Sequence, residues 1–169
     1  MTRIVFSILG IIASIVIIAA VFMPWLTVHV GDEPWRRHVG DASGWEITQG
    51  DIYFQREGLT QERNPLPLVA FVGGIIGGIF CLGCLLLASR PLAIPVLFGG
   101  LAALAGGIWA FGDIFEAHYH IFDGVNEYMT VGQGAYVCMG AGLALLFVGA
   151  ILLNVMKKPS VKKSQPYRI

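Results

Sequence analysis

The sequence predicts an all-α membrane protein, a bundle of four transmembrane helices with a small extracellular β-hairpin cap in its first outer loop. Of its 169 residues, 56% are hydrophobic and 13% are charged. An average soluble domain has about 45–50% apolar and about 25% charged residues. This composition excludes intrinsic disorder, nucleic-acid binding through a basic face, and an ordinary soluble enzyme. The length predicts a single domain that spans residues 1–169.

Four apolar stretches contain no Asp, Glu, Lys or Arg, and they cover residues 4–22, 66–89, 92–112 and 129–156. A helix needs about 20 residues to cross about 30 Å of hydrocarbon, so each stretch predicts a membrane span. The second and third stretches are joined only by Ser89-Arg90-Pro91, which predicts antiparallel neighbours.

The first stretch has a cleaved signal peptide as its alternative interpretation. A signal peptide has an apolar core of about 7–15 residues followed by a small-x-small cleavage pattern. The stretch here is longer, and Phe22-Met23-Pro24-Trp25 follows it. We therefore expect a retained membrane anchor.

Charges are divided unequally between the two sides of the predicted bundle. One side has seven basic residues and no acid: Arg3, Arg90, Lys157, Lys158, Lys162, Lys163 and Arg168. The other side has four arginines and eleven acids, in the loop 23–65 and between the third and fourth spans. Short cytoplasmic loops carry an excess of Lys and Arg. We therefore expect a multi-pass protein of the cell membrane with both termini in the cytoplasm.

The loop 23–65 is long for a connection without structure of its own. Residues 25–30 alternate and are rich in β-formers, which predicts a strand that leaves the membrane. Residues 45–48 and 51–54 flank Gln49-Gly50, which predicts a hairpin. Asn64-Pro65-Leu66-Pro67 ends the loop, because proline is tolerated in a first helical turn.

Glycines in the predicted spans indicate close helix packing. Lipid supplies no hydrophobic force between helices, so association depends on small residues that let backbones approach. We expect this packing mainly within one bundle, with docking onto another protein's helix as the alternative. The candidate packing residues are Gly73, Gly74, Gly77, Gly78, Gly106 and Gly107.

Cys81 and Cys84 have the C-x-x-C spacing of thiol oxidoreductases. They fall deep in an apolar helix without a nearby basic residue to activate a thiol. We expect these two cysteines and Cys138 to be structural, and no cofactor is predicted.

The four histidines, His29, His38, His118 and His120, all fall on the predicted outer side. Glu116 and His120 would share a helix face if the third helix continued that far, and imidazole with carboxylate suits Zn or Cu. Glu116, His118 and His120 are therefore weak metal candidates, against the ordinary expectation of isolated surface histidines. Sensing of pH is a second use for the same residues.

Aromatic residues near the ends of the spans predict anchors at the headgroup level. These are Trp25, Trp109, Phe111, Tyr128 and Tyr136. Trp35 and Trp45 fall farther out, so we expect them to pack within the cap.

The tail 157–169 follows the last span and is rich in lysine. Its simplest role is to fix orientation as a stop-transfer signal. The alternative is contact with anionic lipid or an acidic partner through Lys157, Lys158, Lys162 and Lys163.

Three segments carry a resemblance: Met23-Pro24-Trp25-Leu26-Thr27-Val28, Ser43-Gly44-Trp45-Glu46 and Val131-Gly132-Gln133-Gly134-Ala135-Tyr136. With the glycine-rich helix pair between them, their order resembles small uncharacterised prokaryotic proteins with four transmembrane helices. The layout is also similar to that of claudin-type tetraspan proteins, whose first outer loop forms a β-sheet near a Trp. Neither resemblance implies a catalytic residue.

The spans carry no ionisable carboxylate or amine, and their only carboxamides are Gln133 and Asn154. Ion-coupled transport places ionisable groups inside the membrane. We therefore expect a non-enzymatic accessory or scaffold subunit that contacts the lipid bilayer and associates with other membrane proteins or with itself, without nucleic acid. A small transporter, a membrane enzyme, or a metal- or pH-responsive protein that uses the histidines remains the alternative.

Overall fold

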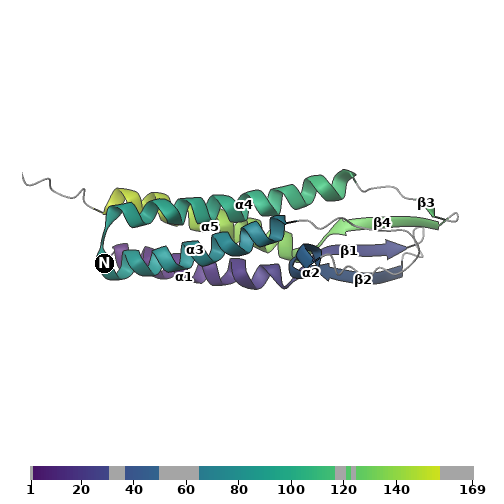
Figure 1. Cartoon of the computed structure of the whole chain (residues 1–169), viewed down its shortest axis with the longest axis horizontal. Helices are drawn as coiled ribbons and strands as arrows, with labels where there is room; N and C mark the ends of the chain where they lie inside the picture. Colours follow the sequence, from purple (N-terminus) through teal and green to yellow (C-terminus); the bar gives the residue numbers. More distant parts are fainter. Residues whose placement is uncertain (1, 31–36, 50–64, 117–120, 123–124, 157–169) are drawn as a thin grey trace, which may run out of the picture.

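The computed structural model describes residues 2–30, 37–49, 65–116, 121–122 and 125–156. Four long helices, α1 (Thr2–Val21), α3 (Leu66–Leu87), α4 (Ala93–Glu116) and α5 (Gln133–Val155), lie side by side along the long axis of the molecule (Figure 1). A β-sheet extends the bundle at one end, called here the sheet end. The described N-terminus and the end of α5 lie together at the opposite, terminal end.

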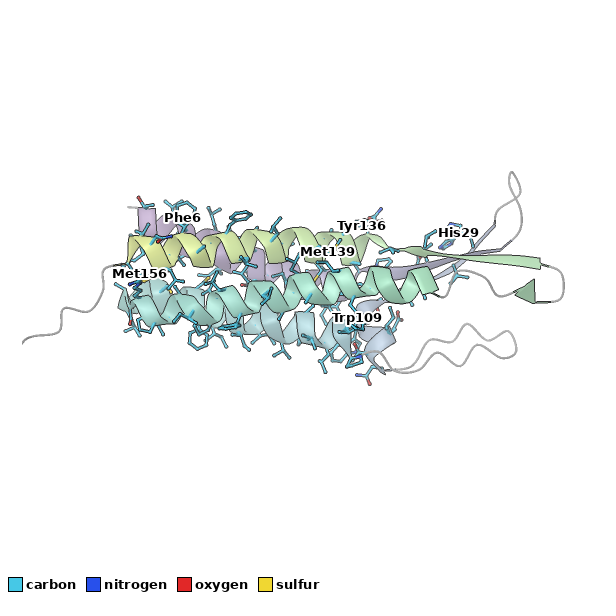
Figure 2. The ribbon with its side chains drawn as sticks, turned by 90° about the horizontal axis from the view of Figure 1, so that it is seen from above. Phe6, His29, Trp109, Tyr136, Met139 and Met156 are labelled. Atoms are coloured by element: carbon cyan, nitrogen blue, oxygen red, sulfur yellow. The ribbon has the colours of Figure 1, made fainter. Side chains whose placement is uncertain are left out.

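The described residues contain four helices that are long and apolar enough to cross a membrane, as the sequence predicts. Each helix packs against its neighbours in a closed ring, α1 on α3, α3 on α4, α4 on α5 and α5 on α1. The predicted antiparallel contact between α3 and α4 is confirmed. Large apolar side chains remain exposed on every long helix, among them Ile15, Ile79, Phe98 and Phe147. Figure 2 shows side chains along the outside of the bundle, with Trp109 and Tyr136 labelled toward the sheet end. Such a surface suits a multi-pass membrane protein.

The sheet is antiparallel, and its described strands lie in the order β2-β1-β4-β3. Strand β1 (Pro24–Val30) confirms the strand predicted at 25–30 and continues α1 almost directly. Strand β4 (Val125–Val131) leads into α5 and pairs with β1. Strands β2 (Arg37–Ser43) and β3 (Ile121–Phe122) form the two sides. The cap therefore includes both segments that link the helices at the sheet end, instead of the first loop alone.

The predicted hairpin across 45–54 is wrong in its first half, because Gly44–Gln49 forms the short helix α2. A capping box stabilises its first turn. The Glu46 backbone N–H donates to Ser43 Oγ (3.2 Å), and Glu46 Oε2 accepts from the Ser43 backbone N–H (2.7 Å). The second half of the predicted hairpin, 51–54, lies outside the described residues.

Two predicted helix boundaries are also wrong. The third span continues past residue 112 to Glu116. The last helix begins at Gln133 instead of residue 129, because residues 129–131 belong to β4. Their side-chain pattern suits a strand as well as a span, and pairing of Leu26 with Val131 decides between the two.

Trp25 was expected to anchor the bundle at the lipid headgroups, but it is buried within the protein. The residue is only 1% exposed, and its Nε1–H donates to the Ala20 carbonyl at 2.8 Å. Gly44 and Gly134 both pack against this ring. Trp25 therefore fills the junction between the bundle and the sheet.

Two arginines bind the carboxyl ends of helices at the terminal end of the bundle. Arg90 Nε donates to the Leu153 carbonyl at 3.0 Å, and Arg3 donates to the Leu85 carbonyl at 3.4 Å. The last carbonyls of a helix lack intrahelical donors, and a cation at this end complements the helix dipole. These two basic residues therefore stabilise α5 and α3.

Ala88, the residue directly after α3, adopts a left-handed conformation with φ 52° and ψ 30°. Glycine is the usual residue here, because a Cβ costs about 1–2 kcal/mol in this region. Ala88→Gly should therefore stabilise the protein by about 0.5–1 kcal/mol, after the greater freedom of glycine in the unfolded chain is counted. Thermal or denaturant unfolding of the purified protein measures the difference.

The matched control is Ala144→Gly, at an exposed position inside α5. Glycine costs about 1 kcal/mol inside a helix, so this variant should be less stable than the wild type. Destabilisation by both substitutions would contradict the strain assigned to Ala88.

Candidate functional site

The α3–α4 interface brings two backbones into direct contact. A Cβ on Gly73 would lie 2.8 Å from the Gly99 carbonyl oxygen, and a Cβ on Gly99 would lie 2.5 Å from that of Gly73. Farther toward the sheet end, a Cβ on Gly106 would lie 2.9 Å from the Leu66 carbonyl oxygen. Any larger side chain at these positions would separate the helices.

The α4–α5 interface has the same construction. A Cβ on Gly100 would lie 2.6 Å from the Leu146 nitrogen and 2.9 Å from the Gly142 carbonyl oxygen. Gly107 packs against Met139 of α5. Gly99 thus contacts α3 and Gly100 contacts α5, and neither is among the six candidate packing residues.

The remaining predicted glycines face α1 and the centre of the bundle. Gly74 packs against Ile17, and Gly78 packs against Ser14. A Cβ on Gly77 would lie 2.5 Å from Leu145 Cδ2, on the opposite side of the ring of helices. All six candidate glycines therefore lie at contacts inside the bundle, whereas Gly140 has open space where its Cβ would be.

The interior of the bundle offers little chemistry. Among the described residues, the buried polar side chains are Ser7 and Ser14, whose hydroxyls lack a hydrogen-bond partner. Cys81, Cys84 and Cys138 are buried and free. Cys138 Sγ donates to the Ala103 carbonyl at 3.6 Å, across the α4–α5 interface. This arrangement suits a packing role for the three cysteines.

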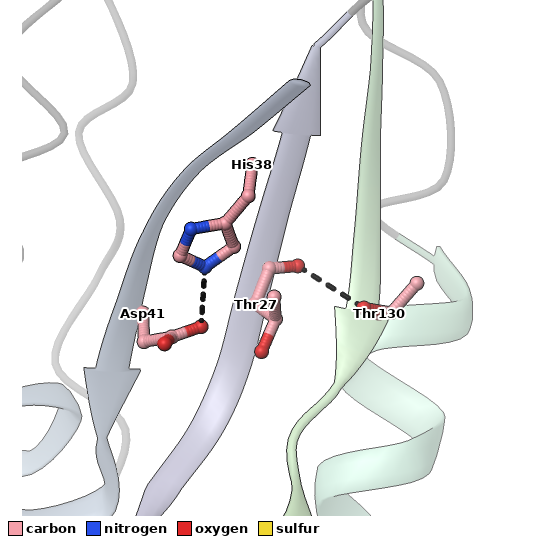
Figure 3. A network of polar contacts seen from close by, with 4 residues as sticks. All are labelled: Thr27, His38, Asp41 and Thr130. Atoms are coloured by element: carbon pink, nitrogen blue, oxygen red, sulfur yellow. Dashed lines mark hydrogen bonds and ion pairs between the residues drawn. The ribbon is translucent and has the colours of Figure 1, made fainter. Parts of the chain in front are cut away.

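A polar cluster lies on one face of the sheet and comprises Thr27, His29, His38, Asp41 and Thr130. Thr27 stands opposite both Asp41 and Thr130 in the strand register, and His29 stands opposite His38. His38 Nε2 lies 3.0 Å from Asp41 Oδ1, and Thr130 Oγ1 donates to the Thr27 carbonyl at 3.3 Å (Figure 3). The imidazole rings of His29 and His38 are 5.6 Å apart between centroids.

Hydrogen bonds within the polar cluster stabilise the charged form of Asp41. His38 lowers the pKa of this carboxyl most strongly, and a side-chain hydrogen bond from Thr27 lowers the pKa further. An anionic Asp41 only accepts hydrogen bonds, so the Nε2 of His38 carries the proton in this contact.

The pairing of His29 with His38 was not predicted from the sequence. Strand β2 was not predicted, and the register is shifted by an irregularity between Val28 and His29. The structure does not test the predicted metal candidates. Glu116 ends α4, while His118 and His120 lie outside the described residues. Within the described part of the chain, no three metal-binding side chains converge.

An aromatic cluster joins α2 to the bundle. The Trp45 ring lies 5.7 Å from that of Phe22 and 6.0 Å from that of Phe71, between centroids. Trp45 therefore packs on Phe22, directly after α1, and on α3, and not only within the cap. Trp109 and Tyr136 are exposed near the sheet end of the bundle (Figure 2), where an interfacial anchor is expected.

The other predicted contacts fall outside what the structure describes. Trp35 and the tail lysines Lys157, Lys158, Lys162 and Lys163 are in undescribed segments, and the side chains of Phe111 and Tyr128 are likewise not described. Their roles stay predictions.

No protein-family model matches the chain, and no curated protein is significantly similar to it. The resemblance to claudin-type and small prokaryotic four-helix proteins therefore stays a prediction.

Gly100→Ala should destabilise the bundle by about 1–3 kcal/mol, the usual cost of overpacking. The added methyl group would meet the backbone of α5, which cannot rotate away as a side chain can. Thermal unfolding of the purified protein in detergent measures the loss. Gly140→Ala is the matched control because its Cβ meets nothing within 4 Å. Equal stability of the two variants would contradict the packing argument.

Asp41 provides a pH-dependent contact on the sheet. Its folded-state pKa is depressed, so its contribution is present above the unfolded value of about 3.9 and is lost as the pH falls through the folded value. His38→Ala should raise the Asp41 pKa, and Thr27→Val should raise it less. Carboxyl carbon NMR of the labelled protein measures both. An Asp41 pKa that is unchanged by His38→Ala would contradict the assigned hydrogen bond.

Proposed function

We propose that this chain is a non-enzymatic membrane protein that serves as an accessory or scaffold subunit and presents its sheet to other proteins. The observation that carries the proposal is the rigid attachment of the sheet to the bundle. Strand β1 begins at Pro24, close to the end of α1, and β4 reaches α5 through Gly132 alone. These two strands pair with each other.

The junction is also fixed by specific contacts. The Gly132 backbone N–H donates to the Trp25 carbonyl at 2.7 Å, and Gly132 packs directly on Pro24. The buried Trp25 ring and the Trp45–Phe71 contact connect the cap to α1 and α3. A sheet held in this way keeps its orientation relative to the membrane, as a binding platform requires.

The bundle interior supports this choice over a transporter. Transport of ions or polar solutes uses ionisable or polar groups inside the membrane. In the described helices, the buried polar side chains are two serines, and the glycine contacts close the helices onto one another. The glycine faces are occupied within the bundle, so the sheet end is the better surface for a partner.

The proposed orientation places the sheet outside the cell membrane and both termini in the cytoplasm. Arg3 and Arg90 lie at the terminal end, beside the end of α5 from which the lysine-rich tail continues. Positive charge is enriched on the cytoplasmic side, which supports this orientation.

A cysteine at Gln49, exposed at the end of α2, should react with a membrane-impermeant maleimide in intact cells. A cysteine at Ser160, in the tail, should react only after the membrane is permeabilised. The parent chain is a suitable control because its own cysteines are buried. Ser43 is unsuitable for labelling because it caps α2. Labelling of position 160 in intact cells would refute the orientation.

The scaffold role is tested by photo-crosslinking in native membranes. A photoreactive residue at Gln49 or Thr130 should yield a discrete protein adduct, and the same partner should copurify in a fixed ratio. The same residue at Phe98 or Phe147, on the exposed helix surface, is the matched control and should react mainly with lipid.

A discrete adduct from a second copy of this chain would also support the proposal. A monomer without adducts from the sheet positions would oppose it. Substrate-dependent flux in liposomes would favour the transporter instead.

A further inference from the structure

His29 and His38 form a directly opposed pair on neighbouring antiparallel strands. Their ring centroids are 5.6 Å apart, and the rings are inclined at 69°. Two imidazoles on one metal ion, with metal–nitrogen bonds of about 2.0–2.1 Å, place their ring centroids roughly 5–6 Å apart. The backbone thus already holds the two rings at a chelating distance.

The local register produces this arrangement. The pairing shifts between Val28 and His29, so that Val28 stands opposite Gly40 while His29 stands opposite His38. Val39 is the extra residue on β2, as in a β-bulge. Without the shift, His29 would stand opposite Val39, and the two histidines would not share a face.

Asp41 prepares one of the two histidines as a ligand. Its carboxylate accepts from His38 Nε2 at 3.0 Å, which leaves the Nδ1 lone pair of that ring free to bind a metal. A carboxylate in this position is the usual partner of a metal-binding histidine, because it fixes the tautomer and raises the basicity of the ring. Thr27 stands opposite Asp41 on β1 and also lowers the pKa of this carboxyl.

The pair is also accessible. The side chains of His38 and Asp41 are 53% and 41% exposed, and His29 is partly exposed. A metal ion can reach the rings from solvent, and water can complete its coordination.

We propose that His29 and His38 bind a divalent transition-metal ion, Zn²⁺ or Cu²⁺, with Asp41 as a positioning residue. Imidazole suits these ions, whereas Mg²⁺ and Ca²⁺ prefer oxygen ligands. The site has two protein ligands, and water occupies the remaining positions. The ion bridges β1 and β2, and this role is independent of the proposed scaffold function.

The test uses the purified full-length protein in detergent, stripped with a chelator and titrated with Zn²⁺ or Cu²⁺ alone. Calorimetry should give one ion per chain, and the electron paramagnetic resonance spectrum of bound Cu²⁺ should show coupling to two nitrogen nuclei. His29→Ala and His38→Ala should each abolish saturable binding over the same range. Asp41→Asn should weaken binding by roughly 10- to 100-fold while the two-nitrogen signature persists.

Two controls identify the ligands. His118→Ala combined with His120→Ala removes the other histidines and should leave affinity and stoichiometry unchanged. Mg²⁺ should not compete. Circular dichroism and size exclusion should show that each variant keeps the wild-type fold, which is expected for His29, His38 and Asp41 because their side chains are at least partly exposed.

Undiminished binding in the His29→Ala and His38→Ala variants would overturn the proposal. Loss of binding in the His118 and His120 double variant would also overturn it, because the site would then need ligands outside the pair. A wild-type protein that binds neither ion would overturn it as well.

Discussion

The structure depends on the junction where α1 meets β1 and β4 meets α5, because the distance between the two neighbouring elements changes there. Packed helix axes are about 8–10 Å apart, whereas paired strands are about 4.7–4.9 Å apart. The chain makes this change within a few residues, and only glycine leaves enough room for it. A Cβ on Gly134 would lie 2.7 Å from the Ala20 carbonyl oxygen, and Gly132 touches Pro24. The buried Trp25 fills the space left where the elements diverge. The packing of α1 on α5 and the pairing of β1 with β4 therefore depend on the same close contacts at the junction.

The membrane architecture could be predicted because it is a local property of composition. A run of about 20 residues without charge has few alternatives to a membrane span, and β1 was predicted from its own alternation. The errors lie where local patterns are ambiguous. Residues 129–131 suit a helix or a strand equally well, and pairing with β1 resolves the choice. Residues 44–49 contain β-formers such as Ile47 and Thr48, yet the capping box between Ser43 and Glu46 favours a helical turn.

The two candidate sites also differ in how far the sequence predicts them. Glycine positions can be selected from the sequence because small residues in a span have few uses besides packing, although the pattern cannot say which helix each one meets. Gly77 lies against Leu145 of α5, while Gly73 lies against Gly99 of α4. The pairing of His29 with His38 could not be predicted. It requires a strand with a weak local signal, Arg37–Ser43, and a register shift within that strand.

The polar cluster and the helix-packing contacts therefore lie in different parts of the molecule along its long axis. Within the described chain, the buried side chains of the bundle are apolar apart from two serines, and the polar cluster lies on the sheet. The two parts are mechanically connected. Strand β2 continues into α2, whose Trp45 packs on Phe71 of α3, while β1 continues from α1. A ligand that bridges His29 and His38 would link β1, which continues from α1, to β2, which is connected to α3 through α2, at the far end of the sheet. The relative positions of α1 and α3 and the geometry of the sheet are thus coupled through a closed loop of contacts, so occupancy of the sheet and stability of the bundle cannot be independent.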